Sequence, residues 1–224
     1  MKLIERSLGL EIELKENVIS IIVVEDITLR LPIIEELNYE MSGNDGNWLL
    51  VENEKKYEIA KKVEIILEPF SLELNNKKIK TRLYQDIKSV SQDYGFAQGI
   101  EVHSHICSYI EQLIEKIPYP IKYKDEWDLL EILKAYEVEI EEECCDVCDK
   151  LFSYIKLVNH VCGINIFIII NIKQYLTENQ TLELYKLAMY NKLQLILIEF
   201  NMQNNKIDNE EVYVIDKDGC IISY

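Results

Sequence analysis

Three short, almost wholly apolar runs near the two ends of the chain constrain its fold more than any other feature. They span residues 18–24, 164–171 and 195–198 and are rich in Ile, Val and Leu. Such runs are typical of strands covered on both faces, and each is far shorter than the roughly 20 residues of a membrane-spanning helix. We therefore expect an α/β fold with a mixed sheet built from both chain ends, and no membrane segment.

The segments around these runs predict the rest of an α/β head. Alternating apolar residues at 10–14 predict a β-hairpin with the first run. Helical spacing at 29–37 and a strand pattern at 48–51 follow. A capping-box sequence at Thr177 predicts a helix between the second and third runs, which makes one βαβ unit, and residues 212–222 predict a terminal hairpin.

The middle of the chain has a different pattern. Apolar residues recur at helical intervals in four segments, 83–90, 100–117, 127–136 and 144–162. The last segment ends at Gly163, a residue suited to a helix C-cap. The pattern predicts two domains: an α/β head at 1–62 and 145–224 with flanking helices, and an inserted all-helical leg at 63–144.

The net charge and the N-terminal sequence limit the functions and the cellular location that we expect. Lys and Arg number 24 and Asp and Glu 40, which gives a net charge of −16. Because this average field repels a polyanion, any nucleic-acid role needs a local basic patch. Charges flank Leu3 and Ile4, and no apolar core of a signal peptide follows. We therefore expect a cytoplasmic protein with its six cysteines reduced.

Nucleotide binding is the first activity to consider for such a head, because a phosphate-binding loop would follow the first buried strand. The turn there, 25–28, reads Glu-Asp-Ile-Thr and has no glycine or lysine. Its two carboxylates would repel phosphate, so we interpret them as a helix cap and a hydrogen-bond acceptor. The cysteines in 144–148 lack a second ligand pair for zinc, and His103 and His105 form no H-E-x-x-H motif. We predict neither enzymatic activity nor a bound nucleotide.

An acidic cluster opens the third helical segment. It contains four carboxylates, Asp125, Glu126, Asp128 and Glu131. They could supply oxygen ligands to Ca²⁺, a hard cation that tolerates irregular geometry. The alternative is a solvated acidic turn, since acids suit the positive end of a helix dipole.

Basic residues are sparse and clustered. The candidates for phosphate contacts are Lys55, Lys56, Lys77, Lys78, Lys80 and Arg82. In a monomer such a patch is usually a solvated surface. If several copies met around an axis, each weak patch would be multiplied, and an acidic protein could then hold a duplex by its phosphates.

Five stretches, in this order, resemble a known family, the ring-forming accessory proteins of type II-A CRISPR loci. The stretches are 21–27 (IIVVEDI), 129–135 (LLEILKA) after the Asp125-Glu126 pair, 166–177, 195–199 and 214–218. The chain departs from the family pattern at 159–163, which has no lysine, and at Ile121 and Tyr123, which are not acidic.

The resemblance implies a non-enzymatic homotetramer that acts in spacer acquisition. Its head would resemble a P-loop ATPase that has lost its nucleotide site, and its helical leg would bind Ca²⁺. The central hole of the ring would accept linear double-stranded DNA by its ends. The expected protein partners are the CRISPR integrase complex and the effector nuclease of the same locus.

Two other functions stay open. One is an acidic protein-interaction module without DNA affinity, which the net charge of −16 favours. The other is an α/β enzyme that binds nucleotide through a divergent phosphate loop.

Overall fold

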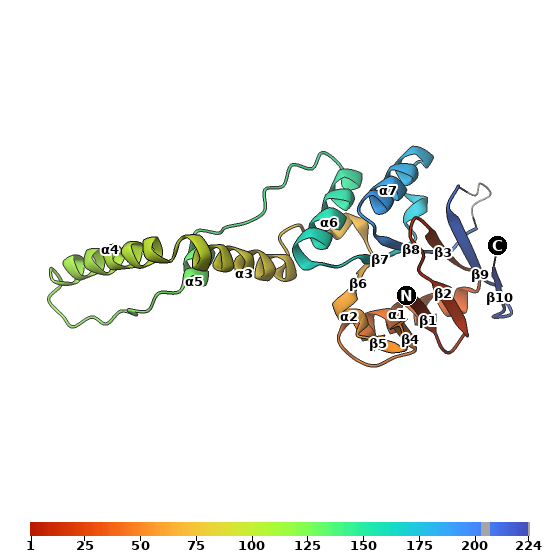
Figure 1. Cartoon of the computed structure of the whole chain (residues 1–224), viewed down its shortest axis with the longest axis horizontal. Helices are drawn as coiled ribbons and strands as arrows, with labels where there is room; N and C mark the ends of the chain where they lie inside the picture. The colour runs from red at the N-terminus through yellow and green to blue at the C-terminus, as the bar shows by residue number, and fades with distance from the viewer. Residues whose placement is uncertain (203–206, 224) are drawn as a thin grey trace. The chain divides into compact units, whose positions relative to one another are not determined.

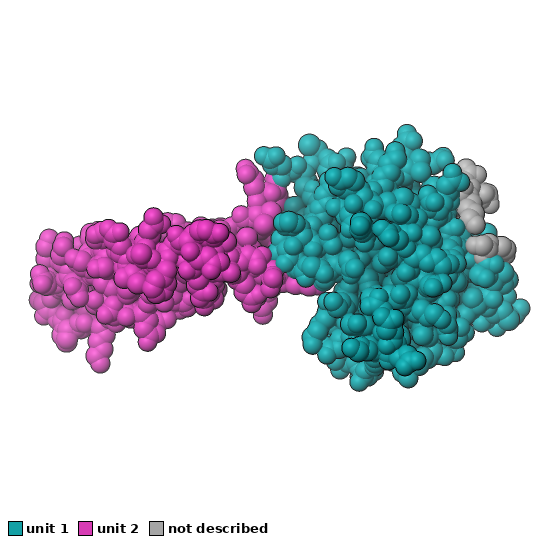
Figure 2. Space-filling model, in the orientation of Figure 1, with its two compact units in different colours: residues 1–74, 143–224 teal, residues 75–142 magenta. Residues whose placement is uncertain are grey.

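The structure, a computed structural model, describes residues 1–202 and 207–223. It divides into two compact units, coloured separately in Figure 2: unit 1 contains residues 1–74 and 143–224, and unit 2 contains residues 75–142. The first boundary lies later than the expected residue 63. The reason is a strand, β6 (Val63–Ile66), whose Val63 and Ile66 are buried in the sheet of unit 1.

A six-stranded sheet forms the centre of unit 1 (Figure 1). Its order is β10 (Ile221–Ser223), β9 (Glu210–Ile215), β3 (Ile19–Val24), β8 (Gln194–Glu199), β7 (Ile166–Ile170) and β6. The strands from β9 to β6 run parallel, and β10 is antiparallel to β9. Every residue of β3 and β7 is buried, as expected for strands covered on both faces. The predicted α/β class with a mixed sheet is confirmed, and so is the terminal hairpin.

A second sheet of unit 1 has four antiparallel strands. Its order is β2 (Leu10–Glu13), β1 (Lys2–Glu5), β4 (Trp48–Glu52) and β5 (Lys55–Tyr57). The predicted hairpin between 10–14 and 18–24 is therefore wrong, because β2 pairs with β1 while β3 lies in the other sheet. Asn17, at a φ of 61°, stands in the turn that separates them. The β2 side chains Leu10 and Ile12 nevertheless join the same core as β3.

Helices accompany these sheets, and capping residues set the ends of two of them. Those of unit 1 are α1 (Ile27–Met41), α2 (Ile59–Lys62), α6 (Val147–Cys162) and α7 (Glu178–Tyr190), with short 3-10 turns at Pro69–Ser71 and Ile172–Gln174. Thr177 and Gln180 form the predicted capping box of α7. Gly163 ends α6 in the left-handed region, with a φ of 67°, as predicted for a C-cap.

Unit 2 consists of α3 (Lys77–Tyr94), α4 (Phe96–Ile114), α5 (Leu129–Ala135) and their connections. Only Gly95 separates α3 from α4, and the chain at 115–128 then runs back alongside α4 to reach α5, as Figure 1 shows. Leu133 is buried where α5 packs on α3, but α4 has no buried residue at all. In the part of the chain that the structure describes, no helix is long and apolar enough to cross a membrane.

Candidate functional site

Three of the four predicted calcium ligands lie in or just before the first turn of α5. Asp128 is its N-cap, and Oδ1 accepts a hydrogen bond from the Leu130 N–H at 2.9 Å. Lys124 Nζ lies 3.2 Å from both carboxylate oxygens of Glu131 and 4.0 Å from Oε2 of Glu126. The hydrogen bond to Glu131 raises the pKa of Lys124. The Lys124 ammonium thus pairs with two of these carboxylates and offsets part of their charge, and a helix cap uses the third.

The fourth predicted ligand, Asp125, lies in a different group of side chains. Its Oδ1 is 3.3 Å from Nε2 of His103 and 3.2 Å from Sγ of Cys107. The same Sγ is 3.7 Å from both ring nitrogens of His103. The thiol donates to the Asp125 carboxylate, and this hydrogen bond raises the pKa of Cys107. Among the described residues, this trio brings potential metal-ligating atoms within 4.8 Å of one another.

The sequence patterns do not identify this trio. His103 fits no metalloprotease motif, and Cys107 belongs to no cluster of cysteines. The one available signal is the spacing of these two residues, since residues four apart on a helix share one face. Asp125 follows Cys107 by 18 residues, and only the return of the chain alongside α4 brings it close.

The predicted DNA contacts of unit 2 lie on the first two turns of α3: Lys77, Lys78, Lys80 and Arg82. Lys80 and Arg82 are each engaged with a carboxylate. Lys80 forms an ion pair with Glu139, whose hydrogen bond raises the pKa of Lys80. Arg82 Nε lies 3.4 Å from Oδ1 of Asp86, one turn later. The helix therefore gathers the predicted cations, and neighbouring acids offset part of their charge.

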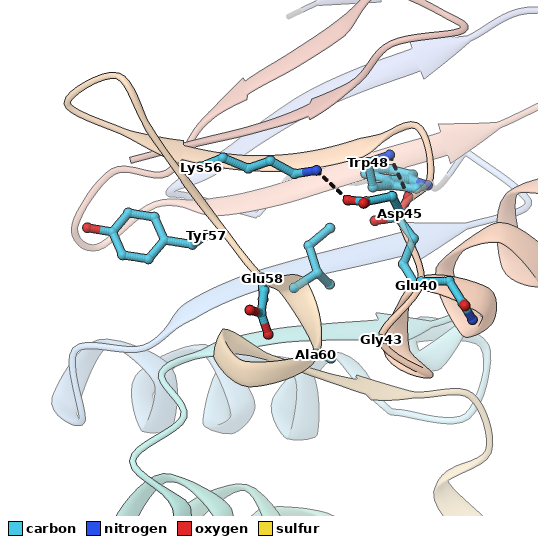
Figure 3. Close-up of a pocket in the computed structure, with 10 residues that line it drawn as sticks. Glu40, Gly43, Asp45, Trp48, Lys56, Tyr57, Glu58 and Ala60 are labelled. Atoms are coloured by element: carbon cyan, nitrogen blue, oxygen red, sulfur yellow. Dashed lines mark hydrogen bonds and ion pairs between the residues drawn. The ribbon is translucent and has the colours of Figure 1, made fainter.

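The other two predicted contacts, Lys55 and Lys56, lie on β5 at the edge of the four-stranded sheet and are exposed. Lys56 Nζ is 2.6 Å from Oδ1 of Asp45, an ion pair drawn in Figure 3. Lys56 and Asp45 line a pocket with Glu40, whose Oε1 accepts from the backbone N–H of Trp48 at 2.8 Å. Burial raises the pKa of Glu40. Acidic groups therefore accompany Lys56 on this face.

The glycine-containing loop that precedes β4 has a structural role. A Cβ at Gly46 would overlap the carboxylate of Glu40, so only glycine lets that carboxylate reach the backbone of Trp48. The carbonyl of Gly46 also accepts a hydrogen bond from Arg6 Nη2 at 2.7 Å. The Glu40 contact joins α1 to β4, and the Arg6 contact joins the loop to the turn after β1.

The turn after β3 carries a helix cap, as interpreted from the sequence. The Thr28 N–H donates to Oδ1 of Asp26 at 2.8 Å, and this hydrogen bond lowers the pKa of Asp26. Arg30 donates to the carbonyls of Val24 at 3.1 Å and Phe200 at 2.7 Å, and its guanidinium lies 5.0 Å from the Phe200 ring centroid. In α/β sheets, nucleotides commonly bind at the carboxyl ends of the strands. Here Arg30 links the carboxyl ends of β3 and β8 through its hydrogen bonds, and the Asp26 carboxylate occupies the N-terminus of α1.

A buried polar network joins the strands of unit 1, and no sequence pattern indicates it. Lys173 Nζ and the Tyr185 hydroxyl each donate to Oε1 of Glu210 at 2.5 Å. The backbone N–H of Lys173 donates to Oε1 of Glu199 at 3.1 Å. All four side chains are buried, and burial raises the pKa of Glu199 to about 7. The network ties β8, β9 and α7 to the turn that follows β7.

Two comparisons concern the sequence. Residues 39–219 match the family model described as CRISPR-associated protein (Cas_Csn2). A relative from Streptococcus agalactiae, described as CRISPR-associated protein Csn2, is 23% identical over 211 residues. The alignment covers 91% of this chain and 90% of the relative. The resemblance drawn from the five ordered stretches is confirmed.

A third comparison concerns the fold. The structure of cbiO1 from Clostridium perfringens, described as part of the ABC transporter complex cbiONQ, matches with a TM-score of 0.53 and 11% identity. The match covers 96% of this chain and 79% of that one. At this identity the likeness concerns the fold alone, and it agrees with an α/β head.

Proposed function

Because the chain belongs to the Csn2 family of CRISPR-associated proteins, we propose that it acts in spacer acquisition as a non-enzymatic homotetrameric ring that binds the ends of linear double-stranded DNA. The observation that carries this proposal is the family match over residues 39–219, which extends into both units. In this role the protein performs no bond chemistry. It holds DNA while the integrase complex and effector nuclease of the locus act.

The end of β3 supports a function without nucleotide hydrolysis. A phosphate needs free N–H donors and positive charge at a helix N-terminus. At α1, the Asp26 carboxylate accepts from one of those N–H groups and places a negative charge there. The guanidinium of Arg30 is already bonded to three backbone carbonyls and packed on Phe200. A screen of melting temperature with ATP and GTP should therefore show no shift, whereas a nucleotide-binding enzyme would be stabilised.

Assembly of several copies is supported by α4. Its apolar side chains recur at helical spacing, yet none is buried within the chain, and Ile100 and Leu113 are 52% and 46% exposed. A helix of this kind gains its stability by covering the apolar face with another surface. We propose that the leg of a second copy provides that cover.

DNA contact is assigned to the cations on α3, with Lys55 and Lys56 as further candidates. The pairs of Lys80 with Glu139 and of Arg82 with Asp86 are partly or fully exposed, and such pairs are weak. Phosphate groups can therefore replace those carboxylates at low cost, and the symmetry of a ring repeats the patch in every copy.

The test is the salt dependence of binding to a linear duplex. A variant with Lys77, Lys78, Lys80 and Arg82 all changed to Gln should bind more weakly, and its plot of log affinity against log salt should flatten by about 1 for each of these cations that binds a phosphate in the wild type. The matched control changes four other exposed lysines, Lys116, Lys122, Lys156 and Lys217, to Gln. Equal slopes for the two variants would remove the α3 cations from the interface.

Calcium is proposed to bind at Asp125, Glu126, Asp128 and Glu131. The ion would take the place of the Lys124 ammonium, which now supplies the positive charge beside Glu126 and Glu131. Calorimetry should detect Ca²⁺ uptake that is abolished when all four acids become amides, and kept when the exposed Glu101, Glu115 and Glu141 become Gln. Melting that ignores chelator, with no heat of binding, would refute the calcium proposal.

A further inference from the structure

The trio of His103, Cys107 and Asp125 combines one nitrogen, one sulfur and one oxygen donor on a single surface of unit 2. This donor set differs from the all-oxygen shell that calcium prefers. Imidazole and thiolate are ligands of Zn²⁺ and similar borderline metals, and a carboxylate commonly joins them.

The distances within the trio fit a tetrahedral ion. Bonds of about 2.0 Å to nitrogen or oxygen and about 2.3 Å to sulfur place neighbouring ligand atoms of a tetrahedron about 3.3–3.6 Å apart. The three separations here are 3.3 Å for N···O, 3.2 Å for S···O and 3.7 Å for S···N. The three atoms therefore already form a triangle of the size that one face of a zinc tetrahedron has.

The local fold explains why they converge. His103 and Cys107 are one turn apart on α4 and so share a face. Asp125 approaches from the returning chain, which is held close by a second contact, the Tyr123 hydroxyl donating to Glu111 at 2.9 Å. His103 is also 5.7 Å from the Trp127 ring, centroid to centroid, and is three-quarters buried. Two independent segments are thus fixed on either side of the site.

Access and charge are also suitable. His103 and Cys107 line a surface pocket of about 260 Å³, which lets an ion enter and leaves its fourth position to a water molecule. The Cys107 thiol and the Asp125 carboxylate share a hydrogen bond, so metal binding exchanges the thiol proton for the ion. A bound dication would offset the negative charge of the resulting thiolate and of Asp125.

From this geometry we infer that His103, Cys107 and Asp125 bind one Zn²⁺-class ion, which clamps the 115–128 segment to α4. Asp125 also belongs to the calcium set proposed above. In this inference it binds the Zn²⁺-class ion, and Glu126, Asp128 and Glu131 remain for calcium. The inference does not depend on the DNA-binding proposal, because its ligands are defined by their geometry alone.

The test uses the reduced, full-length protein, stripped of metal and titrated with Co²⁺ in the presence of excess Ca²⁺. We expect one Co²⁺ per chain, with the intense visible bands of tetrahedral cobalt and a thiolate charge-transfer band. Each equivalent of Co²⁺ that binds should release one proton from the thiol. Added Zn²⁺ should displace the cobalt and so abolish both kinds of band. Wild-type protein that gives no thiolate band would overturn the inference.

Variants assign the ligands. Cys107→Ser should remove the thiolate band, and Asp125→Asn should weaken cobalt binding at least about tenfold. Because Asp125 is 70% exposed, its variant tests the site even if the cysteine variant fails to fold. The matched control, Cys144→Ser with Cys145→Ser and Cys148→Ser, should keep the band. A band that survives Cys107→Ser and disappears in the control would place the metal at the other cysteines and refute the assignment.

Discussion

The buried carboxyl of Glu199 leads to a prediction about stability and pH. Glu199 is 4% exposed, and burial raises its pKa from 4.5 to about 7, although the Lys173 N–H and ammonium oppose the rise. Between these two pH values the folded chain keeps a proton that the unfolded chain has released. The linkage relation then makes the free energy of unfolding fall as pH rises through this window. The contribution of the protonated Glu199 to the free energy of unfolding is complete below pH 4.5 and is lost as pH rises through about 7.

The magnitude follows from the two pKa values. One pKa unit corresponds to about 1.4 kcal/mol, so the interval from 4.5 to about 7 amounts to about 3 kcal/mol. Glu199→Gln keeps an oxygen that can accept from the Lys173 N–H but cannot ionise. We therefore expect the variant to match the wild type near pH 4.5 and to exceed it by about 3 kcal/mol at pH 8.

The assay is urea unfolding followed by circular dichroism from pH 4.5 to pH 8, at one fixed protein concentration because assembly shifts apparent stability. Glu16→Gln, at an exposed position, serves as the control and should follow the wild type at every pH. A difference between Glu199→Gln and wild type that stays constant across this pH range would contradict a Glu199 that titrates near neutral pH.

Three further predictions use the same unfolding assay. Lys173→Met should cost about 3–5 kcal/mol, because it leaves the buried Glu210 carboxylate without its ammonium partner, and a cost under about 1 kcal/mol would contradict a buried ion pair. Thr177→Ala should cost about 1 kcal/mol through removal of the α7 cap, and an unchanged stability would show that the cap contributes nothing. Gly163→Ala should cost about 1–2 kcal/mol because of its φ of 67°, whereas Gly95→Ala, at a φ of −130°, should cost less; equal costs would count against the strain argument.

Much of the head could be predicted because its signals are local. The strands β3, β7 and β8 are continuous apolar runs, and burial on both faces requires that composition. The caps at Thr177 and Gly163 depend on residues within a few positions of each other, so the sequence contains them in full.

The errors arose where the local pattern of a strand does not identify its pairing partner. Strand β2 has the alternation of a half-buried strand, but nothing local shows that it pairs with β1 and not with β3. Strand β6 adjoins the helical region in sequence, and only its pairing with β7, about a hundred residues later, makes it part of the sheet.

The candidate site was predicted in part. The acids before and within α5 were visible as a cluster, but the sequence did not show that Lys124 would pair with Glu126 and Glu131. The trio at His103 forms only because the chain returns along α4. The network at Lys173 forms only because the sheet brings the turn after β7 close to β9. Both are tertiary features, and periodicity carries no information about them.

Whether this chain forms a ring entered by DNA ends can be measured in a single binding experiment. The purified protein, with its mass fixed by light scattering and with calcium present, is mixed with a linear blunt duplex or with the same sequence as a covalently closed circle. We expect a tetramer that binds the linear duplex and not the circle, because a ring must be threaded from an end. Equal binding to both forms, or binding to neither at low salt, would contradict a threaded ring, and the second result would favour an acidic protein-interaction module.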